Sequence, residues 1–328
     1  MINKNCSMTS NVPRSAFLAA GAALVAAPHL ASAQALTKVR ISGSLDHDII
    51  GALWGVQSGI FAKYGLDVDV RSANSGAVVT AAVIGGSLEI GKGSLLTLLS
   101  AHARGVSLVL EAPASIWNTD APESAFVVAR GSPIRSGRDL NGRTISVPAL
   151  GDLYQIAISA WIDQRGGDSR TVRFLELPVR AAAESIAAGR VDAANLAEPI
   201  LSDALQSGKC QVIGHAQDGI AKHFIVTSYF CTAEYAAKSA DVLARFRRGL
   251  YEAAAYANTH HIEMVPILAK YSGVDEKFLA ALIPAPVATS PKQLDPKMIQ
   301  PIIDTAVKYK ALASAFPAKD ILDPNALG

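Results

Sequence analysis

Short apolar segments and longer amphipathic segments alternate along the chain from residue 37 to about residue 208. The short segments have the length of buried strands, and the longer ones have the three-to-four-residue apolar spacing of helices that pack on a sheet. This pattern predicts strands at residues 38–41, 66–70, 88–90, 106–111, 125–129, 143–147, 172–175, 191–194, 210–214 and 224–232. It predicts helices at residues 49–64, 77–84, 95–103, 153–164 and 180–188, and a further helix that follows Glu198-Pro199. Such alternation is typical of α/β proteins with a parallel sheet between helices.

The pattern changes after residue 214, where one β-rich segment is followed by a tail that is mostly helical. The clearest amphipathic helix covers residues 241–258, with Leu243, Phe246 and Leu250 on one face. Further helices are predicted at residues 262–271, 275–282 and 296–312. We therefore expect two αβ lobes, with the helical tail returning to the first: residues 34–124 and 214–328 form lobe 1, and residues 125–213 form lobe 2.

Small and hydroxyl-bearing residues stand where several predicted strands lead into helices. The segments are 42–44, 72–76, 91–94 and, in the second αβ series, 148–152. Each places unpaired backbone N–H groups and the positive end of a helix dipole in the same space. Turns of this kind at the edge of a parallel sheet form a crevice for a small polar or anionic ligand.

The first 33 residues have the features of a secretory signal peptide. Lys4 and Arg14 form a positive region, residues 17–27 are apolar, and Ala31-Ser32-Ala33 matches the small-residue cleavage pattern before Gln34. The apolar run is too short to span a bilayer. We expect cleavage after Ala33 and a periplasmic mature protein.

The charge balance excludes some partners. Removing the leader's two cations from the chain's 30 basic residues leaves 28, which equals the 28 acidic residues. No basic stripe exists that would favour nucleic acid or an anionic membrane surface. Two cysteines remain in the mature chain, Cys210 and Cys231; they either form a disulfide or stay as buried thiols.

Several catalytic motifs fail on inspection. Residues 86–92 match G-x-x-x-x-G-K, but Gly93 stands where a phosphate-binding loop needs Ser or Thr, and the apolar strand lies between the glycines. No G-x-S-x-G string occurs, and neither the histidines nor the cysteines have metal-ligand spacing. We therefore expect no cofactor, no metal and no catalytic residue.

A few polar and aromatic residues are candidates on their own chemistry. Asp46-His47-Asp48 is interpreted as a solvated turn in which an aspartate caps the next helix, at the edge of the crevice. Trp117 follows a strand and either lines the pocket or covers the core. Glu198 either faces the pocket or complements a helix N-terminus. Trp54 and Trp161 lie within helices and are expected to pack in the core.

The chain resembles a known family across the whole mature sequence. Residues 55–68, GVQSGIFAKYGLDV, look like the opening of the periplasmic substrate-binding proteins of ABC importers for sulfonates, nitrate, taurine and thiamine pyrimidine precursors. The segments 88–94, 139–143, 188–193, 198–199 and 319–324 match that family in order.

The resemblance implies a periplasmic-binding-protein type II fold. It has two αβ lobes, each with a mixed five-stranded sheet, joined by two crossing strands, and a ligand bound between them by hinge closure. Carried over by position, the site comprises Ser44, Ser75, Gly76, Gly93, Ser94, Trp117, Leu150, Gly151, Asp152 and Glu198. Asp46, in the turn at the edge of the crevice, completes the set of candidate ligand-binding residues. The implied partners of this expected monomer are a small-molecule ligand, an ABC permease and its ATPase.

The residues also bear on the ligand and on rival functions. The matched turns offer hydrogen-bond donors and two carboxylates with no cation except Lys92, which favours a zwitterionic, hydroxylated or heteroaromatic solute over an inorganic anion. A sensory binding protein that signals to a receptor remains an alternative. A pyrimidine-precursor synthase of the same fold is a weaker alternative. A resemblance to those enzymes would imply a cysteine-rich iron-binding stretch, and this sequence lacks one.

Overall fold

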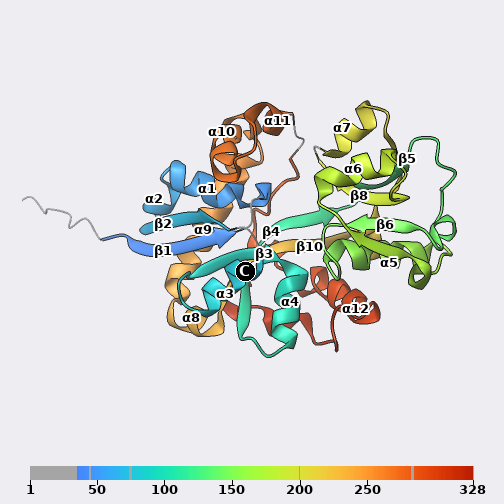
Figure 1. Ribbon diagram of the computed structural model, residues 1–328. Helices are drawn as coiled ribbons and strands as arrows, with labels where there is room; N and C mark the ends of the chain where they lie inside the picture. Colours follow the sequence, from blue (N-terminus) through green and yellow to red (C-terminus); the bar gives the residue numbers. More distant parts are fainter. Residues whose placement is uncertain (1–34, 44–45, 74–75, 199, 282–283, 328) are drawn as a thin grey trace, which may run out of the picture. The chain divides into compact units, whose positions relative to one another are not determined.

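The computed structural model describes residues 35–43, 46–73, 76–198, 200–281 and 284–327 (Figure 1). One five-stranded sheet has the order β2-β1-β3-β10-β4. Its strands are β1 (Thr37–Gly43), β2 (Leu66–Ser72), β3 (Ile90–Ser94), β4 (Leu108–Asn118) and β10 (His223–Thr232). Strand β1 is parallel to β2 and β3, whereas β10 is antiparallel to both β3 and β4. The sheet is therefore mixed, and we call the part of the chain built on it the first lobe.

A second five-stranded sheet has the order β7-β6-β8-β5-β9. Its strands are β5 (Ser124–Ala129), β6 (Thr144–Val147), β7 (Arg173–Glu176), β8 (Ala193–Ala197) and β9 (Cys210–Gly214). Strand β6 is parallel to β7 and β8, and β5 is antiparallel to β8 and β9. We call the part built on this sheet the second lobe.

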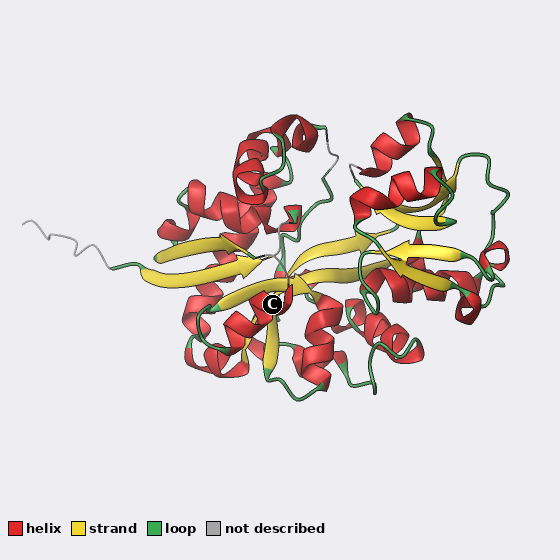
Figure 2. Cartoon of the chain, viewed as in Figure 1, coloured by secondary structure: helices red, strands yellow, loops and turns green. Residues whose placement is uncertain are grey.

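Helices cover the sheets (Figure 2). In the first lobe they are α1 (Ile50–Gln57), α2 (Ile60–Lys63), α3 (Gly76–Ile84), α4 (Leu95–Ala103), α8 (Ala233–Lys238), α9 (Ala240–Ala257), α10 (His261–Ser272), α11 (Glu276–Ala280) and α12 (Gln300–Lys308). In the second lobe they are α5 (Leu153–Gln164), α6 (Val179–Ala187) and α7 (Ile200–Gln206). Short 3₁₀ helices lie between them, among them η1 (His47–Ile49).

The two sheets repeat one topology, and in both the antiparallel strand comes directly after a crossing between lobes. The chain leaves the first lobe after β4 and enters the second sheet as β5. It returns after β9 and enters the first sheet as β10, which pairs with β4 along its length (Figure 1). The chain thus crosses twice, as the type II binding-protein fold requires.

Alternating residues of the strands face different helices, as the pleat of a strand dictates. In the second sheet Phe126 and Val128 pack with Trp161 of α5, whereas Ala125 and Val127 pack in the cluster of α6 and α7. In the first sheet Val39 and Ile41 pack against α9. The buried faces, rather than helix propensity, hold these short elements in place.

Helix α5 contacts both lobes. Its first turn, with Leu153 and Ile156, belongs to the same apolar cluster as Ile302 and Ile303 of α12. Near its other end, Asp163 accepts a 2.8 Å hydrogen bond from the Tyr309 hydroxyl. These contacts fix the base of the second lobe against the C-terminal helix of the first.

The expected single helix over residues 49–64 is wrong. The structure has α1 and α2, separated at Gly59, which adopts a left-handed conformation with φ of 76°. A glycine adopts this conformation without the steric cost that other residues incur. The chain therefore turns at Gly59 before α2 leads into β2.

Two predicted strand ends are also misplaced. Residues 91–94 were expected as a turn, but they are the body of β3, and Gly91 pairs with Ser42 of β1. Strand β4 continues to Asn118, so the residues around Trp117 lie within a strand rather than after one. At Gly91 a Cβ would lie 2.5 Å from the Phe230 ring of β10 and 2.8 Å from Val79 of α3, so this part of β3 requires a residue without a side chain.

The predicted signal peptide, residues 1–33, and the candidate ligand residues Ser44 and Ser75 lie outside the described residues, as does Pro199. Among the helices that the structure describes, none is both long and apolar enough to cross a membrane.

Candidate functional site

A cavity of about 620 Å³ is lined by residues of both lobes. The first lobe contributes residues of η1, the start and one face of α4, β10 and the segment around α11. The second lobe contributes the N-terminus of α5 and the end of β8. This volume is within the range of small-molecule sites.

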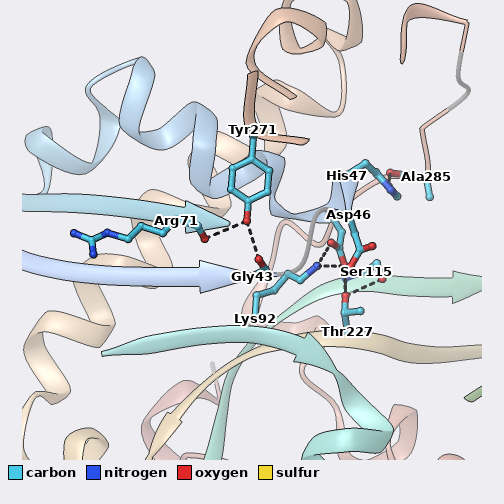
Figure 3. Close-up of polar contacts among 10 residues, drawn as sticks. Gly43, Asp46, His47, Arg71, Lys92, Ser115, Thr227, Tyr271 and Ala285 are labelled. Carbon is cyan, nitrogen blue, oxygen red and sulfur yellow. Dashed lines mark hydrogen bonds and ion pairs between the residues drawn. The ribbon is translucent and has the colours of Figure 1, made fainter. Parts of the chain in front are cut away.

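A buried ion pair forms the floor of the cavity on the first lobe (Figure 3). The Lys92 side chain, fully buried in β3, pairs with Asp48 of η1, whose side chain is 3% exposed. Lys92 Nζ also lies 3.3 Å from an oxygen of Asp46, which is more exposed. One ammonium group therefore pairs with both carboxylates of this turn and compensates part of their negative charge.

The pair stays charged despite its burial. Burial alone would raise the pKa of Asp48, but the Lys92 charge, His47 and hydrogen bonds from Lys92 and Thr227 outweigh it and lower that pKa. Burial would lower the pKa of Lys92, and the charges of Asp48 and Asp46 raise it instead. The first-lobe wall therefore carries its charge in a compensated form.

Thr227 of β10 links this pair to β4. Its hydroxyl donates to Asp48, while the Ser115 amide donates to the same hydroxyl at 3.1 Å. The register of β10 against β4 shifts on both sides of Thr227. Such a bulge aims consecutive side chains to one side, and both Val226 and Thr227 line the cavity.

The second-lobe wall begins at the N-terminus of α5. Asp152 caps this helix, because its carboxylate accepts a 2.8 Å hydrogen bond from the Gln155 amide. Gly151 precedes it with φ of 77°, a value that favours glycine. Burial raises the pKa of Asp152 to about 6, against backbone hydrogen bonds that lower it, and the Glu176 carboxylate adds to the rise.

Glu198 and Glu123 stand side by side where the second sheet meets the crossing segment. The Glu198 amide donates to the Glu123 carbonyl at 3.0 Å, and the Glu198 carboxylate accepts from the Ser202 amide at 3.1 Å. Burial raises the pKa of Glu123, the neighbouring carboxylates Asp48 and Asp46 add to the rise, and His47 opposes it. Both glutamates line the cavity without an ion pair among the described residues.

Helix α4 extends the cavity away from the strand ends. Ser94 precedes this helix without a side-chain capping bond, and Thr97, Ser100 and Arg104 line the cavity farther along. These four positions recur on one helical face. Arg104 is the one lysine or arginine among the described lining residues.

The C-terminal helices close another side. The Tyr271 hydroxyl of α10 lies 2.9 Å from the Gly43 carbonyl oxygen, and it ties α10 to the end of β1 (Figure 3). Phe278 of α11 lines the cavity, and the guanidinium of Arg180 from α6 lies 5.0 Å from its ring centre. This cation–π contact joins the two lobes at the edge of the cavity.

The predicted site residues divide into three groups. Asp46, Ser94, Gly151, Asp152 and Glu198 line the cavity. Gly76, Gly93, Trp117 and Leu150 are not among its described lining residues. Ser44 and Ser75 lie outside the described residues.

Two interpretations need correction. Asp48 is not part of a solvated capping turn, because it is buried on Lys92. Trp117 is 1% exposed within the core, and its indole N–H donates to Asp218 at 3.1 Å. The strand was expected to end at residue 111, but β4 continues to Asn118. Trp117 therefore lies within the strand, and its indole reaches Asp218.

The cysteines are free thiols. Cys210 lies in β9 of the second sheet and Cys231 in β10 of the first, and both are buried. The structure therefore has the buried-thiol alternative and no disulfide between these two described residues.

Sequence reasoning missed Glu123, Thr227 and the polar face of α4. Glu123 directly precedes β5, the first strand after the chain crosses to the second lobe. This position next to a crossing could have identified Glu123 as a site residue. Thr227 lies inside a strand, and nothing in the sequence marks the bulge that turns it toward Asp48. No group of three or more His, Cys, Asp or Glu side chains able to hold a metal ion occurs in the described part of the chain.

The fold is that of periplasmic ligand-binding proteins. The periplasmic aliphatic sulphonate binding protein SsuA from Escherichia coli superposes with a TM-score of 0.72 at 19% identity, over 87% of this chain and 92% of that one. SsuA from Xanthomonas axonopodis pv. citri, bound to MOPS, has a TM-score of 0.67 at 19% identity, with 88% and 98% covered. The nitrate-binding protein NrtA from Synechocystis PCC 6803 has a TM-score of 0.67 at 12% identity, with 89% and 87% covered.

The family model described as NMT1/THI5 like matches residues 46–263, which is more than half of the chain. The chain therefore belongs to the NMT1/THI5-like family. No curated protein sequence is significantly similar to it.

Proposed function

We propose that this protein is the extracytoplasmic solute-binding component of an ABC import system. The observation that carries the proposal is the cavity of about 620 Å³ lined by the strand and helix ends of both lobes. A solute held there contacts two αβ units that the chain connects through two crossings, an arrangement that supports hinge closure. The closed form would deliver the solute to a permease and its ATPase.

The remaining assignments belong to the same proposal. Residues 34–124 and 214–328 form one moving lobe, and residues 125–213 form the other. The ligand contacts are Asp46, Ser94, Gly151, Asp152 and Glu198, and the predicted Ser44 and Ser75 stay in the set. The mature protein works in the periplasm as a monomer, after cleavage behind Ala33, and binds its solute without converting it.

A thermal-shift screen tests the proposal. Sulfonates, taurine, nitrate, pyrimidines and aromatic carboxylates are added one by one to the purified protein. A ligand that binds the folded form alone raises the melting temperature by mass action. Ser94→Ala on the first lobe and Glu198→Ala on the second should each reduce the shift.

Asp203→Asn is the matched control. Asp203 lies on α7, the short helix that follows Glu198, but it is exposed and outside the cavity lining. A shift that survives both Ser94→Ala and Glu198→Ala contradicts the placement of the site. Turnover of a bound compound would contradict the transport assignment.

A further inference from the structure

The charged residues of the cavity are predominantly acidic. Among the described lining residues five are carboxylates, and Arg104 is the one lysine or arginine. The carboxylates are Asp46, Asp48, Glu123, Asp152 and Glu198. Lys92, which lies beneath the lining, neutralises part of this charge through Asp48 and Asp46.

The carboxylates without a cation partner come from the crossing segment and the second lobe. Glu123 stands at the start of β5, Glu198 stands after β8, and Asp152 caps α5. None of these three forms an ion pair with a described lysine, arginine or histidine. Their negative charges therefore face the cavity from the wall opposite the Lys92 pair.

Arg104 lines the cavity without pairing with any of them. It directly follows the end of α4, at the opposite end of the helix from Ser94, and forms no ion pair with a carboxylate of the described residues. At 1.5 Å of rise per residue, the nine steps from Leu95 to Arg104 span about 14 Å along the helix axis. Arg180 is engaged with the Phe278 ring at the cavity edge and is not a lining residue.

We infer that the solute carries a cationic or protonatable nitrogen group, which the carboxylates of Glu123, Asp152 and Glu198 bind. This inference rests on the proposed solute-binding function. An organic cation fits better than a metal ion, because the described acidic side chains form no metal-binding group and the cavity is much larger than one ion. It also separates this chain from the structures whose names state sulphonate and nitrate binding.

The pKa directions of two of these carboxylates agree with the inference. Burial raises the pKa of Asp152 to about 6, and it also raises the pKa of Glu123, where the charge of His47 opposes the rise without cancelling it. A sulfonate or nitrate at the same place would add a negative charge to this wall and would be repelled. A cation at this place instead pairs with the negative charges of this wall.

The test compares matched probes that differ in charge. Phenylethylammonium, benzamidinium and 4-aminopyridinium form the cationic set, and phenylethanesulfonate, benzenesulfonate and nitrate form the anionic set. Each is titrated at millimolar concentration into the purified protein, followed by thermal shift and calorimetry at neutral pH. We expect binding by at least one cation and none by the anions.

Variants then connect the binding to the named carboxylates. Glu198→Gln and Asp152→Asn should each weaken the cation about ten- to hundredfold, the loss expected when a hydrogen bond to a charged group is removed. Both replacements keep the shape of the side chain. Asp203→Asn should leave cation affinity unchanged, because Asp203 is exposed and lies outside the cavity lining.

The outcomes are distinguishable. Binding of an anion by the wild-type protein, or cation binding that ignores both carboxylate variants, overturns the charge assignment and leaves the solute-binding function standing. Absence of binding by every probe of both sets counts against the proposed function as well as the charge assignment.

Discussion

The two walls of the cavity are both acidic but differ in how their charge is compensated. On the first lobe, Asp48 and Asp46 share the ammonium of Lys92 from the neighbouring strand β3. On the second lobe, Asp152 and Glu198 accept hydrogen bonds from helix amides and have no described cation partner. The first wall is therefore structural, since its charge holds η1 against the sheet, and the second is available to a ligand.

The pKa directions express the same difference. Burial would raise the pKa of Asp48, but the charges of Lys92 and His47 and the hydrogen bonds from Lys92 and Thr227 together lower it, while burial raises the pKa of Asp152 to about 6. A carboxylate with an internal partner gains little from a bound cation, and one without a partner gains more. Each of the following changes either breaks this comparison or makes it more exact.

The largest effect is expected from Lys92→Met. Removing one partner leaves Asp48 buried without its cation, and breaking a buried pair in this way costs about 3–5 kcal/mol. Urea denaturation should show this loss in the free energy of unfolding at pH 7. The double variant Lys92→Met with Asp48→Asn should recover part of it, and a single variant as stable as the wild type would show that the first wall is not structural.

The next effect concerns Glu111, a first-lobe carboxylate outside the cavity. It is bound by Arg247, which also lies 3.7 Å from Asp323, yet burial raises the pKa of Glu111 to about 7. The folded state therefore holds the proton more tightly than the unfolded state, whose pKa is near 4.5. Stability contributed by protonated Glu111 is lost as pH rises from about 4.5 to about 7.

Urea denaturation across this range measures the loss. A rise in pKa from 4.5 to about 7 corresponds to about 3 kcal/mol at 1.36 kcal/mol per pKa unit, and part of this loss occurs above pH 7. Between pH 4.5 and 7 the free energy of unfolding of the wild-type protein should therefore fall by about 2 kcal/mol more than that of Glu111→Gln. Parallel profiles for the two proteins would refute the assignment.

A smaller effect is expected from Asp152→Asn. The raised pKa of Asp152 means that its ionisation destabilises the folded state as pH rises from about 4 to about 6. The amide variant keeps a capping oxygen and lacks this cost. It should gain about 1 kcal/mol relative to the wild type at pH 7, a value discounted for partial exposure.

Thermal unfolding at pH 4, 6 and 7 gives the measurement, with Asp203→Asn as the exposed control. A variant that is less stable than the wild type at neutral pH would place Asp152 with the structural carboxylates. The contrast between the two walls would then fail.

The smallest effect concerns the contact between the lobes. Phe278→Leu removes the ring on which Arg180 rests while keeping an apolar side chain in the cavity lining. A cation–π contact at an exposed site contributes about 0.5–1 kcal/mol, so affinity for a bound solute should fall about two- to fivefold. Calorimetry checks this, and Arg180→Lys, which keeps the charge, should lose less.

Much of the architecture was predictable because it depends on local pattern. The ranges 95–103, 153–164 and 210–214 were predicted with the bounds that the structure has for α4, α5 and β9. Gly105 and Gly166 adopt left-handed conformations near the ends of α4 and α5, and a glycine at that place is a local signal. The resemblance across the mature chain indicated the fold before any contact was known.

The site was predictable in part, for the same reason. Ser94 and Asp152 stand at strand-to-helix turns, where sequence alone marks both the helix start and the polar group. Glu123 and Thr227 escaped prediction because their roles depend on a crossing and on a β-bulge. Trp117 was a candidate because its strand was expected to end early, and its continuation places the indole in the core.

By itself, the sequence determined the alternation of strands and helices, the two αβ series and the polar turns that face the cavity, because periodicity and turn chemistry act over a few residues. Tertiary structure alone decided which carboxylates are compensated. Lys92 and Asp48 are 44 positions apart and meet only because β1 and β3 are paired, with η1 folded over their ends. Glu123 and Glu198 are farther apart in the chain and become neighbours through β5 and β8, where no cation joins them. Charge compensation depends on distances of a few ångströms in three dimensions, and a linear sequence does not contain those distances.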